Sequence, residues 1–527
     1  MKAILSALVV LGSSAWAVGA QNFDLLIRGG KLIDGSGSPW RYADVGVVGD
    51  RIVVVGDIPA DATARSIVDA RGLYVSPGYI DPHSHASEAL EDSSRAGVRA
   101  LIAQGITTAF INPDGFGPQD LGPQLKVIRQ DHPGVNVAPL VGHGAARVAV
   151  MGYENREPTN AELERMKALI GKAMAAGAWG MSDGLFYRPM TYSKTEEVIA
   201  LAKVASSFHG IYTAHVRDDA DYNVGAVGAV DEVIRIAREA KLTSIVTHIK
   251  TMGPRGLGLS TQMIAHIDAA RAEGLEVWAD QHPYLASESN LLAYLVPAWA
   301  QEGPMGEVLQ RLNSAEVRMG MEDNLVRRGG AGLIQIASDD QDQSKEGKRL
   351  GDLAKAQGVE PSEVAIAMLK KAAGRVSVVS FTINESDSDA FMRQPWTMTD
   401  TDGGAPVFGV GMPHPRAYGA FPNKIRRDVV ERHILTLEQA IHAGTGLTAS
   451  VHRLKDRGLI REGAFADILV FDLTKLKDTS TYEKPHAYAE GLVDVFVNGQ
   501  PAIQDSKFLD ARAGRILLRN DPSVSER

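Results

Sequence analysis

The 527-residue sequence predicts an α/β fold: a (β/α)8 TIM-like barrel with a small β-sandwich domain formed from both chain ends. Three observations predict this fold. Short Val- and Ile-rich segments occur at both ends of the chain, apolar segments alternate with helical patterns between them, and eight central segments end in polar residues. Alternating β and α segments are typical of parallel strands joined by crossover helices.

The two ends of the chain have the same sequence pattern. Residues 21–75 contain "FDLLIRGGKLIDGSG" and "ADVGVVGDRIVVVGD", and residues 446–527 contain "GAFADILVFDL" and "GLVDVFVNGQPAI". Apolar, β-branched runs broken by Gly, Asp and Ser predict antiparallel strands joined by tight turns. We therefore interpret the two ends as halves of one β-sandwich.

Residues 76–445 are predicted to form the barrel. Helices are expected at 159–177, 193–210 and 229–241, where the last two have apolar residues at helical spacing. The eight expected strands lie within 78–85, 107–115, 135–144, 178–184, 210–217, 243–250, 275–284 and 396–404. An insertion at about 285–348 lacks the alternation, and it is either a lid over the barrel mouth or an excursion without a role.

Histidines and carboxylates gather at the ends of these strands. His83 and His85 are two residues apart, so in a strand both rings can face one point. Alone, this pair is a weak signal. It becomes informative because His215, His248 and Asp402 end the fifth, sixth and eighth segments. Strand ends form the active site of a β/α barrel, so the pattern predicts a divalent metal site.

The composition narrows the chemistry. The chain has no cysteine, which excludes disulfides, thiolate ligands and cysteine nucleophiles. A metal must then be bound by His and carboxylate, which favours zinc. The net charge of -9 is mixed along the chain, and no long basic stretch indicates a nucleic-acid partner or stable membrane association.

Residues 1–20, "MKAILSALVVLGSSAWAVGA", are predicted to be a signal peptide. One Lys precedes an apolar core that is too short and too interrupted for a membrane span, and small residues follow. A retained N-terminal anchor is the alternative. We expect an exported protein, periplasmic or extracellular, that begins near Gln21.

The polar strand ends resemble the metal-dependent amidohydrolase superfamily, and within it the D-aminoacylases (N-acyl-D-amino-acid deacylases). The resemblance covers nearly the whole mature chain. Its segments, in order, are GYIDPHSH, GITTAFINPDG, LVGHGAARVAVMG, GLFYRP, TAHVRDD, THIK, WADQHPY, QPWTMTDTDG and HPRAYGAFP. It implies a zinc-dependent hydrolase that cleaves N-acyl-D-amino acids to a carboxylate and a free D-amino acid.

The resemblance also implies roles for single residues. His83, His85, His215 and His248 match the family's metal ligands, and Asp402 matches the carboxylate that is both near a metal and the general base acting on a metal-activated water.

The second strand departs from the family, because Asp114 stands where D-aminoacylases commonly have a cysteine ligand. Asp114 is expected to bind or bridge zinc, or else only to shape a turn, and Asp183 is the rival bridging residue. We expect one tight zinc site at Asp114, His215 and His248. A second, weaker site would use His83, His85 and Asp402.

Four further residues are expected to contact the substrate. Lys250 resembles the family's carboxylate-binding lysine, Tyr284 its hydrogen-bonding partner, and Tyr187 an aromatic residue of the pocket. Arg217 follows His215 with the spacing of Lys250 after His248, and it would anchor an acidic side chain or a carboxylate near the metal. For Lys250 and Arg217, charge balance with Asp218, Asp219 or Asp280 is the alternative.

Two alternative functions stay open. Another amidohydrolase reaction, on a dipeptide or a cyclic amide, would use the same metal site. A cyclic-amide hydrolase would not need Lys250 and Tyr284 for a free carboxylate. A non-catalytic metal-binding barrel is the third possibility, although the presence of Asp402 argues against it. The preferred side chain, the acyl group and the oligomeric state are open as well.

Overall fold

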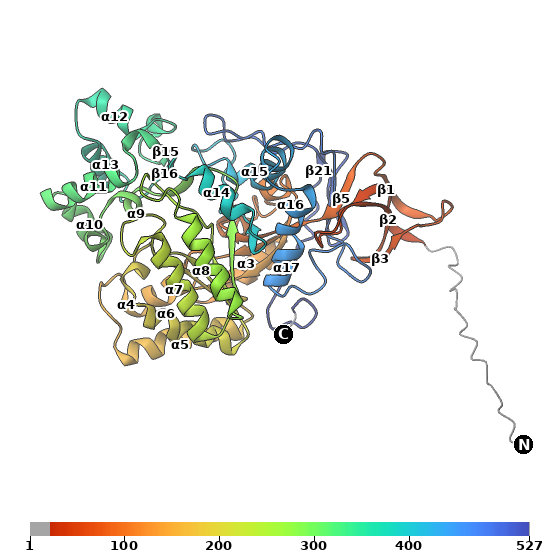
Figure 1. The fold of residues 1–527 in the computed structure, drawn as a ribbon, viewed down its shortest axis with the longest axis horizontal. Coiled ribbons are helices and arrows are strands. Elements are labelled where there is room, and N and C mark those ends of the chain that lie inside the picture. Colours follow the sequence, from red (N-terminus) through yellow and green to blue (C-terminus); the bar gives the residue numbers. More distant parts are fainter. Residues whose placement is uncertain (1–21, 526–527) are drawn as a thin grey trace, which may run out of the picture.

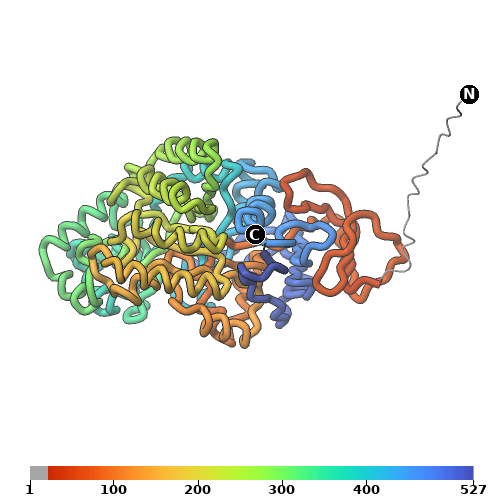
Figure 2. Tube along the Cα trace, turned by 90° about the horizontal axis from the view of Figure 1, so that it is seen from below, coloured from red at the N-terminus to blue at the C-terminus, as the bar shows by residue number. Residues whose placement is uncertain are grey.

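The computed structural model describes residues 22–525 and shows a mixed α/β fold in an elongated molecule. A sheet built from both chain ends forms one end, parallel strands lie in the middle, and a helical insertion forms the other end (Figure 1). The view from below shows the same order, with the N-terminal strands and the insertion farthest apart (Figure 2). The predicted signal peptide lies outside the described residues. Within them, no helix combines the length and apolarity of a membrane span.

The terminal sheet has nine strands, and both ends of the chain contribute to it. Its meeting point is the antiparallel pair of β5 and β18, in which Val75 faces Val470. Strands from the two ends of the chain therefore pair in one sheet, as predicted from the similar sequence pattern of the two ends. Its strands are β1 (Phe23–Leu32), β2 (Arg41–Val48), β3 (Arg51–Gly56), β4 (Ala64–Asp69), β5 (Tyr74–Pro77), β18 (Ile468–Phe471), β19 (Leu492–Val497), β20 (Gln500–Gln504) and β21 (Lys507–Phe508).

Each of the eight predicted central segments contains a parallel strand. One of these segments contains two strands, β8 and β9, which are separated by Leu140, so there are nine strands in all. Three of the strands form one sheet and six form a second sheet. A parallel bridge joins Ser84 of the first strand to Gly403 just after the last. The strands are β6 (Tyr79–Ser84), β7 (Ile106–Ile111), β8 (Asn136–Pro139), β9 (Val141–Gly142), β10 (Gly180–Gly184), β11 (Ile211–His215), β12 (Ser244–Val246), β13 (Val277–Gln281) and β17 (Thr397–Thr399).

The helices between these strands pack side by side over them, with α4 against α5, α5 against α6, and so on to α8. The three predicted helices are present as α5, α6 and α7. Helix α5 begins with a capping box in which Thr159 and Glu162 satisfy each other's backbone N–H groups. The helices of this region are α1 (Ser87–Leu90), α2 (Arg99–Ile102), α3 (Leu121–Asp131), α4 (His143–Met151), α5 (Asn160–Ala175), α6 (Thr195–Ser207), α7 (Gly225–Ala240), α8 (Ser260–Ala272), α14 (Glu385–Met392), α15 (Arg416–Asn423), α16 (Leu437–Ala443) and α17 (Gly446–Val451), with the 3-10 helix η1 (Met190–Tyr192) and the π-helix η5 (Lys424–Glu431).

The insertion is a compact unit with its own hydrophobic core, which includes Leu312, Met321 and Leu369. It extends beyond the expected end near Lys348, because its antiparallel sheet needs a third strand, β16, as the central one. Sequence alternation could not reveal this, since β16 pairs with strands that precede it by tens of residues. The unit contains β14 (Ser287–Asn290), α9 (Leu291–Leu295), η2 (Ala298–Gln301), α10 (Met305–Arg311), α11 (Ala315–Arg327), η3 (Ala331–Leu333), β15 (Ile334–Asp339), η4 (Gln343–Lys345), α12 (Leu350–Gln357), α13 (Pro361–Lys371) and β16 (Val376–Ser380).

Candidate metal centre and active site

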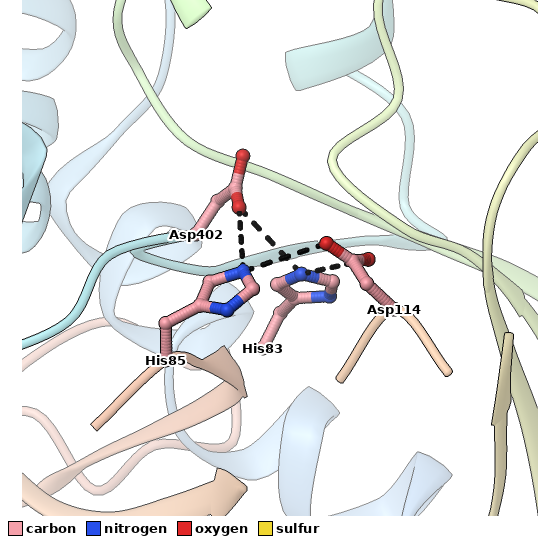
Figure 3. Close-up of side chains that lie close together, drawn as sticks. All are labelled: His83, His85, Asp114 and Asp402. Atoms are coloured by element: carbon pink, nitrogen blue, oxygen red, sulfur yellow. Dashed lines mark ion pairs between the residues drawn. The ribbon is translucent and has the colours of Figure 1, made fainter. Parts of the chain in front are cut away.

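Strand β6 directs two histidines to one point. His83 lies in the strand and His85 just beyond it, and their ring centroids are 5.3 Å apart. The Nε2 atoms of both rings approach Asp114, at 3.3 and 3.5 Å, and Oδ1 of Asp402, at 3.6 and 3.3 Å. Figure 3 shows these four side chains converging from three separate segments. The spacing of the two histidines thus produces the shared orientation that it predicts.

A second group is formed by Asp114, His215 and His248. Its donor atoms lie within 4.8 Å of one another, as do those of the first group of His83, His85, Asp114 and Asp402. Asp114 belongs to both groups and lies between them. All six residues predicted as metal ligands are therefore brought together by the ends of β6, β7, β11, β12 and β17.

Three of these residues have unusual backbone conformations. Asp114, His248 and Asp402 have φ angles of 55°, 37° and 45°, in the left-handed region that non-glycine residues rarely adopt. Such conformations cost about 1–3 kcal/mol each and cluster at functional sites. The surrounding structure supplies the compensation. Asp81 on β6, for example, accepts hydrogen bonds from the backbone N–H and hydroxyl of Thr401, at 3.0 and 2.6 Å.

Burial and neighbouring charges set the protonation of the site. Burial would raise the pKa of Asp402, but the Arg416 guanidinium, 2.5 Å from Oδ2, and nearby histidines hold it well below its usual range. Asp114 behaves in the same way: burial is overcome mainly by His83, and the pKa is held well below its usual range. Both carboxylates are thus ionised at neutral pH, as metal ligands must be.

The histidines divide into two kinds. Burial and the neighbouring His248 lower the pKa of His215 to about 3, and burial and Lys250 lower that of His248 to about 4. Both rings are therefore neutral near pH 7, the form that binds a metal. Burial opposes protonation of His85 as well, but its contacts with Asp114 and Asp402 raise its pKa to about 10.

Several buried donor atoms of the site have no hydrogen-bond partner within the described chain. They are Nδ1 and Nε2 of His83, Oδ1 of Asp114 and Nδ1 of His215. Unpaired buried polar atoms are costly, and native proteins leave few of them without a reason. Nitrogen and carboxylate donors gathered in this way fit zinc or a similar divalent ion.

A pocket opens beside these groups, and the predicted substrate residues divide between two locations. Tyr187, whose ring packs 4.7 Å from that of His215, and Lys250 line the pocket together with His215 and Asp402. The Nζ atom of Lys250 lies 2.6 Å from Nδ1 of His248 and 3.3 Å from Asp219.

The other two predicted substrate residues do not line the pocket. Tyr284 is buried, with its ring edge-on to His414 at 5.2 Å. The guanidinium of Arg217 donates two hydrogen bonds of 2.8 Å to Glu232 on α7 and one to the carbonyl of Thr191. The spacing of Arg217 from His215 suggested a site role, but the chain turns after β11 and directs this side chain to α7. Both side chains therefore lie outside the lining of this pocket among the described residues, and their contact with a substrate stays a prediction.

Asp183, the rival to Asp114, lies in a different cluster. Its Oδ2 atom is 3.0 Å from Nδ1 of His143 and accepts a hydrogen bond from Tyr212. The other ring nitrogen of His143 is 2.9 Å from Glu197, which also pairs with Arg147. The geometry thus places Asp114 among the candidate ligands and leaves Asp183 in a separate ion-pair network.

Four residues of the site were not assigned by the sequence pattern. Arg416 lies in the His-Pro-Arg run, which was recognisable but gave no hint that it would contact Asp402. Asp219 pairs with Lys250, and the only sequence feature that could have indicated this is its position close to His215 in the chain. Glu288 and Arg328 line the pocket from the insertion, where no regular pattern marked them.

Comparison with known proteins agrees with this geometry. The model of the amidohydrolase family matches residues 66–503. A D-aminoacylase of Alcaligenes xylosoxydans xylosoxydans is 33% identical, covering 95% of this chain and 98% of the relative. The structure of an N-acyl-D-glutamate deacylase from Bordetella bronchiseptica, complexed with zinc and a phosphonate inhibitor, has a TM-score of 0.81 and 30% identity, covering 94% of this chain and 100% of that one.

A D-aminoacylase structure described for the role of its binuclear metal centre has a TM-score of 0.80 and 32% identity, again covering 94% of this chain and 100% of that one. These similarities extend over nearly the whole chain, and they include the strands that carry the converging histidines and carboxylates. The chain belongs to the amidohydrolase family, within its D-aminoacylase group.

Proposed function

We propose that this protein is a zinc-dependent hydrolase that cleaves N-acyl-D-amino acids to a carboxylate and a free D-amino acid. The observation that carries the proposal is the pair of ligand groups that share Asp114, with Asp402 held by Arg416 at the edge of a pocket. The relatives named above, similar over nearly the full length, support the same reaction.

The metal would be held by the two ligand groups, in which His83, Asp114 and His215 have buried atoms without a hydrogen bond in the described chain. We assign the tight site to Asp114, His215 and His248, and a weaker second site to His83, His85 and Asp402, with Asp114 between them. A solved relative with a binuclear centre supports two sites. When bound, zinc supplies Lewis acidity, which polarises the scissile carbonyl and makes a water molecule acidic near neutral pH.

Asp402 acts as the general base. One of its oxygens is fixed by Arg416, which leaves Oδ1 directed toward His83 and His85, where it would deprotonate the attacking water. This carboxylate takes the proton of the attacking water and returns it to the departing amine. Because its pKa is held low, Asp402 is ionised across the neutral range, the form in which a carboxylate can act as a base.

The substrate's α-carboxylate is assigned to Lys250, which lines the pocket beside His215. The ammonium is now engaged by Asp219 and His248, so the substrate would replace one of these contacts. Tyr187 forms the adjoining aromatic wall. A carboxylate anchor of this kind favours linear N-acyl amino acids over uncharged cyclic amides.

We also propose that the two parallel sheets close into a (β/α)8 barrel and that the terminal sheet folds as a sandwich. The single residue between β8 and β9 and the bridge between Ser84 and Gly403 support closure. The barrel would span residues 76–445 with the insertion, flanked by sandwich halves at 21–75 and 446–527. A crystal structure in which either sheet ended in an open edge would contradict this.

Export is proposed from the first twenty residues alone. Cleavage near Gln21 and release to the periplasm or the medium would follow. N-terminal sequencing of protein recovered from those fractions tests this, and an intact Met1 would contradict it.

The decisive experiment measures amine release by protein beginning at Gln21, with and without zinc, from matched N-acetyl D- and L-amino acids. We expect zinc-dependent release from the D series only. Release from the L series alone, or from dipeptides and cyclic amides alone, would contradict the proposed substrate while leaving the metal site in place.

A further inference from the structure

One cation of the pocket has no counter-charge. Arg328 follows α11 in the insertion, is only 3% exposed, and lines the same pocket as His215 and Asp402. Within the described chain, its guanidinium has neither a hydrogen bond nor a carboxylate within ion-pairing distance, and its buried Nε atom is unpartnered. The other basic residue that lines the pocket, Lys250, is paired with Asp219.

Aromatic rings hold Arg328 without neutralising it. The guanidinium carbon lies 3.3 Å from the ring centre of Tyr294, 4.1 Å from that of Tyr222 and 5.8 Å from that of Phe186. Stacking uses the flat face of a guanidinium, whereas its N–H donors point outward from the edge. The rings therefore fix the orientation of Arg328 and leave its donors available.

The surrounding groups favour an anion at this position. A buried charge without a partner costs several kcal/mol, more than ring contacts of about 2 kcal/mol each readily offset. The Tyr222 hydroxyl, a second donor in the pocket wall, is also buried and has no hydrogen-bond partner among residues 22–525. Of the carboxylates that line the pocket, Asp219 is paired with Lys250, Asp402 with Arg416, and Glu288 accepts a hydrogen bond from the backbone N–H of His414 while burial raises its pKa.

We propose that Arg328 is a specificity-determining residue that binds a second anionic group of the substrate, in addition to the α-carboxylate. The preferred substrates are then dianionic N-acyl-D-amino acids, with the extra carboxylate on the amino-acid side chain or on the acyl group. This inference rests on the proposed deacylase function. The planar, two-donor edge of Arg328 matches a carboxylate, and the Tyr222 hydroxyl adds a third donor.

The experiment compares isosteric substrates that differ only in charge. N-acetyl-D-glutamate is compared with N-acetyl-D-glutamine for the side-chain position, and N-succinyl-D-leucine with its terminal amide, N-succinamoyl-D-leucine, for the acyl position. We expect kcat/KM to favour one of the two dianions at least about tenfold, as a charge-assisted hydrogen bond to a buried group should. The pair that shows the preference identifies which end of the substrate contacts Arg328.

Arg328→Met should abolish that preference while changing kcat/KM for the neutral partner by less than about threefold, because the lost interaction is with the extra carboxylate only. Arg327→Met is the matched control, since the adjacent Arg327 is paired with Asp323. If Arg328→Met fails to fold, Arg328→Lys, which retains the charge without the fork, should give an intermediate preference. The ratio of kcat/KM for each dianion to that for its neutral partner in the wild-type protein tests the preference without any variant.

Three outcomes would overturn the inference. Wild-type protein that hydrolyses the neutral partners as well as the dianions would overturn it while sustaining the deacylase function. If Arg328→Met lowered kcat/KM equally for the dianion and for its neutral partner, the role of Arg328 would be structural only. Absence of hydrolysis of every N-acyl-D-amino acid would remove the proposed function and this inference together.

Discussion

Two buried clusters of histidine and carboxylate side chains occupy the parallel-strand region, and they differ in whether their polar atoms have partners. In the cluster of His143, Asp183 and Glu197, both ring nitrogens and all carboxylate oxygens are paired, with Arg147 and Tyr212 completing the network. In the candidate metal centre, His83, Asp114 and His215 keep buried atoms without a hydrogen bond in the described chain.

The difference teaches that residue type and burial do not by themselves identify a metal site. Both clusters combine histidine and carboxylate side chains, and both are buried except for His85, which is exposed. Among the described residues, the metal centre leaves histidine and carboxylate atoms convergent and unpaired, which is the arrangement that a cation would complete. In the other cluster the unpaired buried atom is Nε of Arg147, a cationic group that cannot bind a metal. The cluster of His143, Asp183 and Glu197, which we call the saturated cluster, does not need a cation to pair its histidine and carboxylate atoms. It instead stabilises the fold as an ion-pair network.

The largest expected effect comes from removing the ligand shared by both groups. Asp114→Asn should lose bound zinc and bring deacylase activity to background, because both groups lose a carboxylate. Zinc per chain is measured by elemental analysis alongside amine release. Asp183→Asn is the matched control and should keep its zinc. Wild-type zinc content in Asp114→Asn would eliminate the distinction between the clusters.

The second-largest effect is a loss of catalysis in a variant that still binds zinc at the tight site. Asp402→Asn should lower kcat by about 10²–10⁴-fold, since the amide cannot accept the proton of the attacking water. Zinc at Asp114, His215 and His248 should be retained. The exposed Asp340→Asn serves as the control for loss of a carboxylate. Turnover at the wild-type rate in Asp402→Asn would exclude its role as base.

The saturated cluster should respond in stability and not in metal content. Glu197→Gln should lower the free energy of unfolding by about 3–5 kcal/mol, because Arg147 and His143 lose a buried partner. Glu196→Gln, on the adjacent exposed side chain, should cost less than about 1 kcal/mol. Denaturant unfolding of the zinc-loaded proteins measures both. A loss of zinc in Glu197→Gln would show that the two clusters are not independent.

The smallest expected effect is a pH dependence of the same cluster. Burial opposes protonation of His143, but Asp183 and Glu197 raise its pKa to about 9, above the ordinary value of 6.5. This stabilising contribution is complete below pH 6.5 and is lost as pH rises through about 9, with a slope of at most about 1.4 kcal/mol per pH unit. His143→Gln should flatten the fall in unfolding free energy over that range, and the exposed His433→Gln should not. Identical pH profiles of wild type and His143→Gln would refute the assignment.

Much of this organisation was visible in the sequence because it depends on local pattern. Alternating apolar and helical stretches identified all eight central strand segments and helices α5 to α7. The His-x-His spacing placed His83 and His85 on one side of β6, and polar residues at successive strand ends marked His215, His248 and Asp402. The absence of cysteine by itself restricted a metal to histidine and carboxylate ligands.

Only the tertiary structure decided which of these polar residues meet. Asp114 and Asp183 look equivalent in the sequence, yet the strands bring one between two ligand groups and the other against His143. Arg217 and Lys250 have the same spacing from a ligand, but the chain path after each strand sends one to Glu232 and the other into the pocket. Arg416 and Arg328 reach the site from the His-Pro-Arg run and the insertion. Such contacts depend on the three-dimensional packing of distant segments, and sequence periodicity contains no information about it.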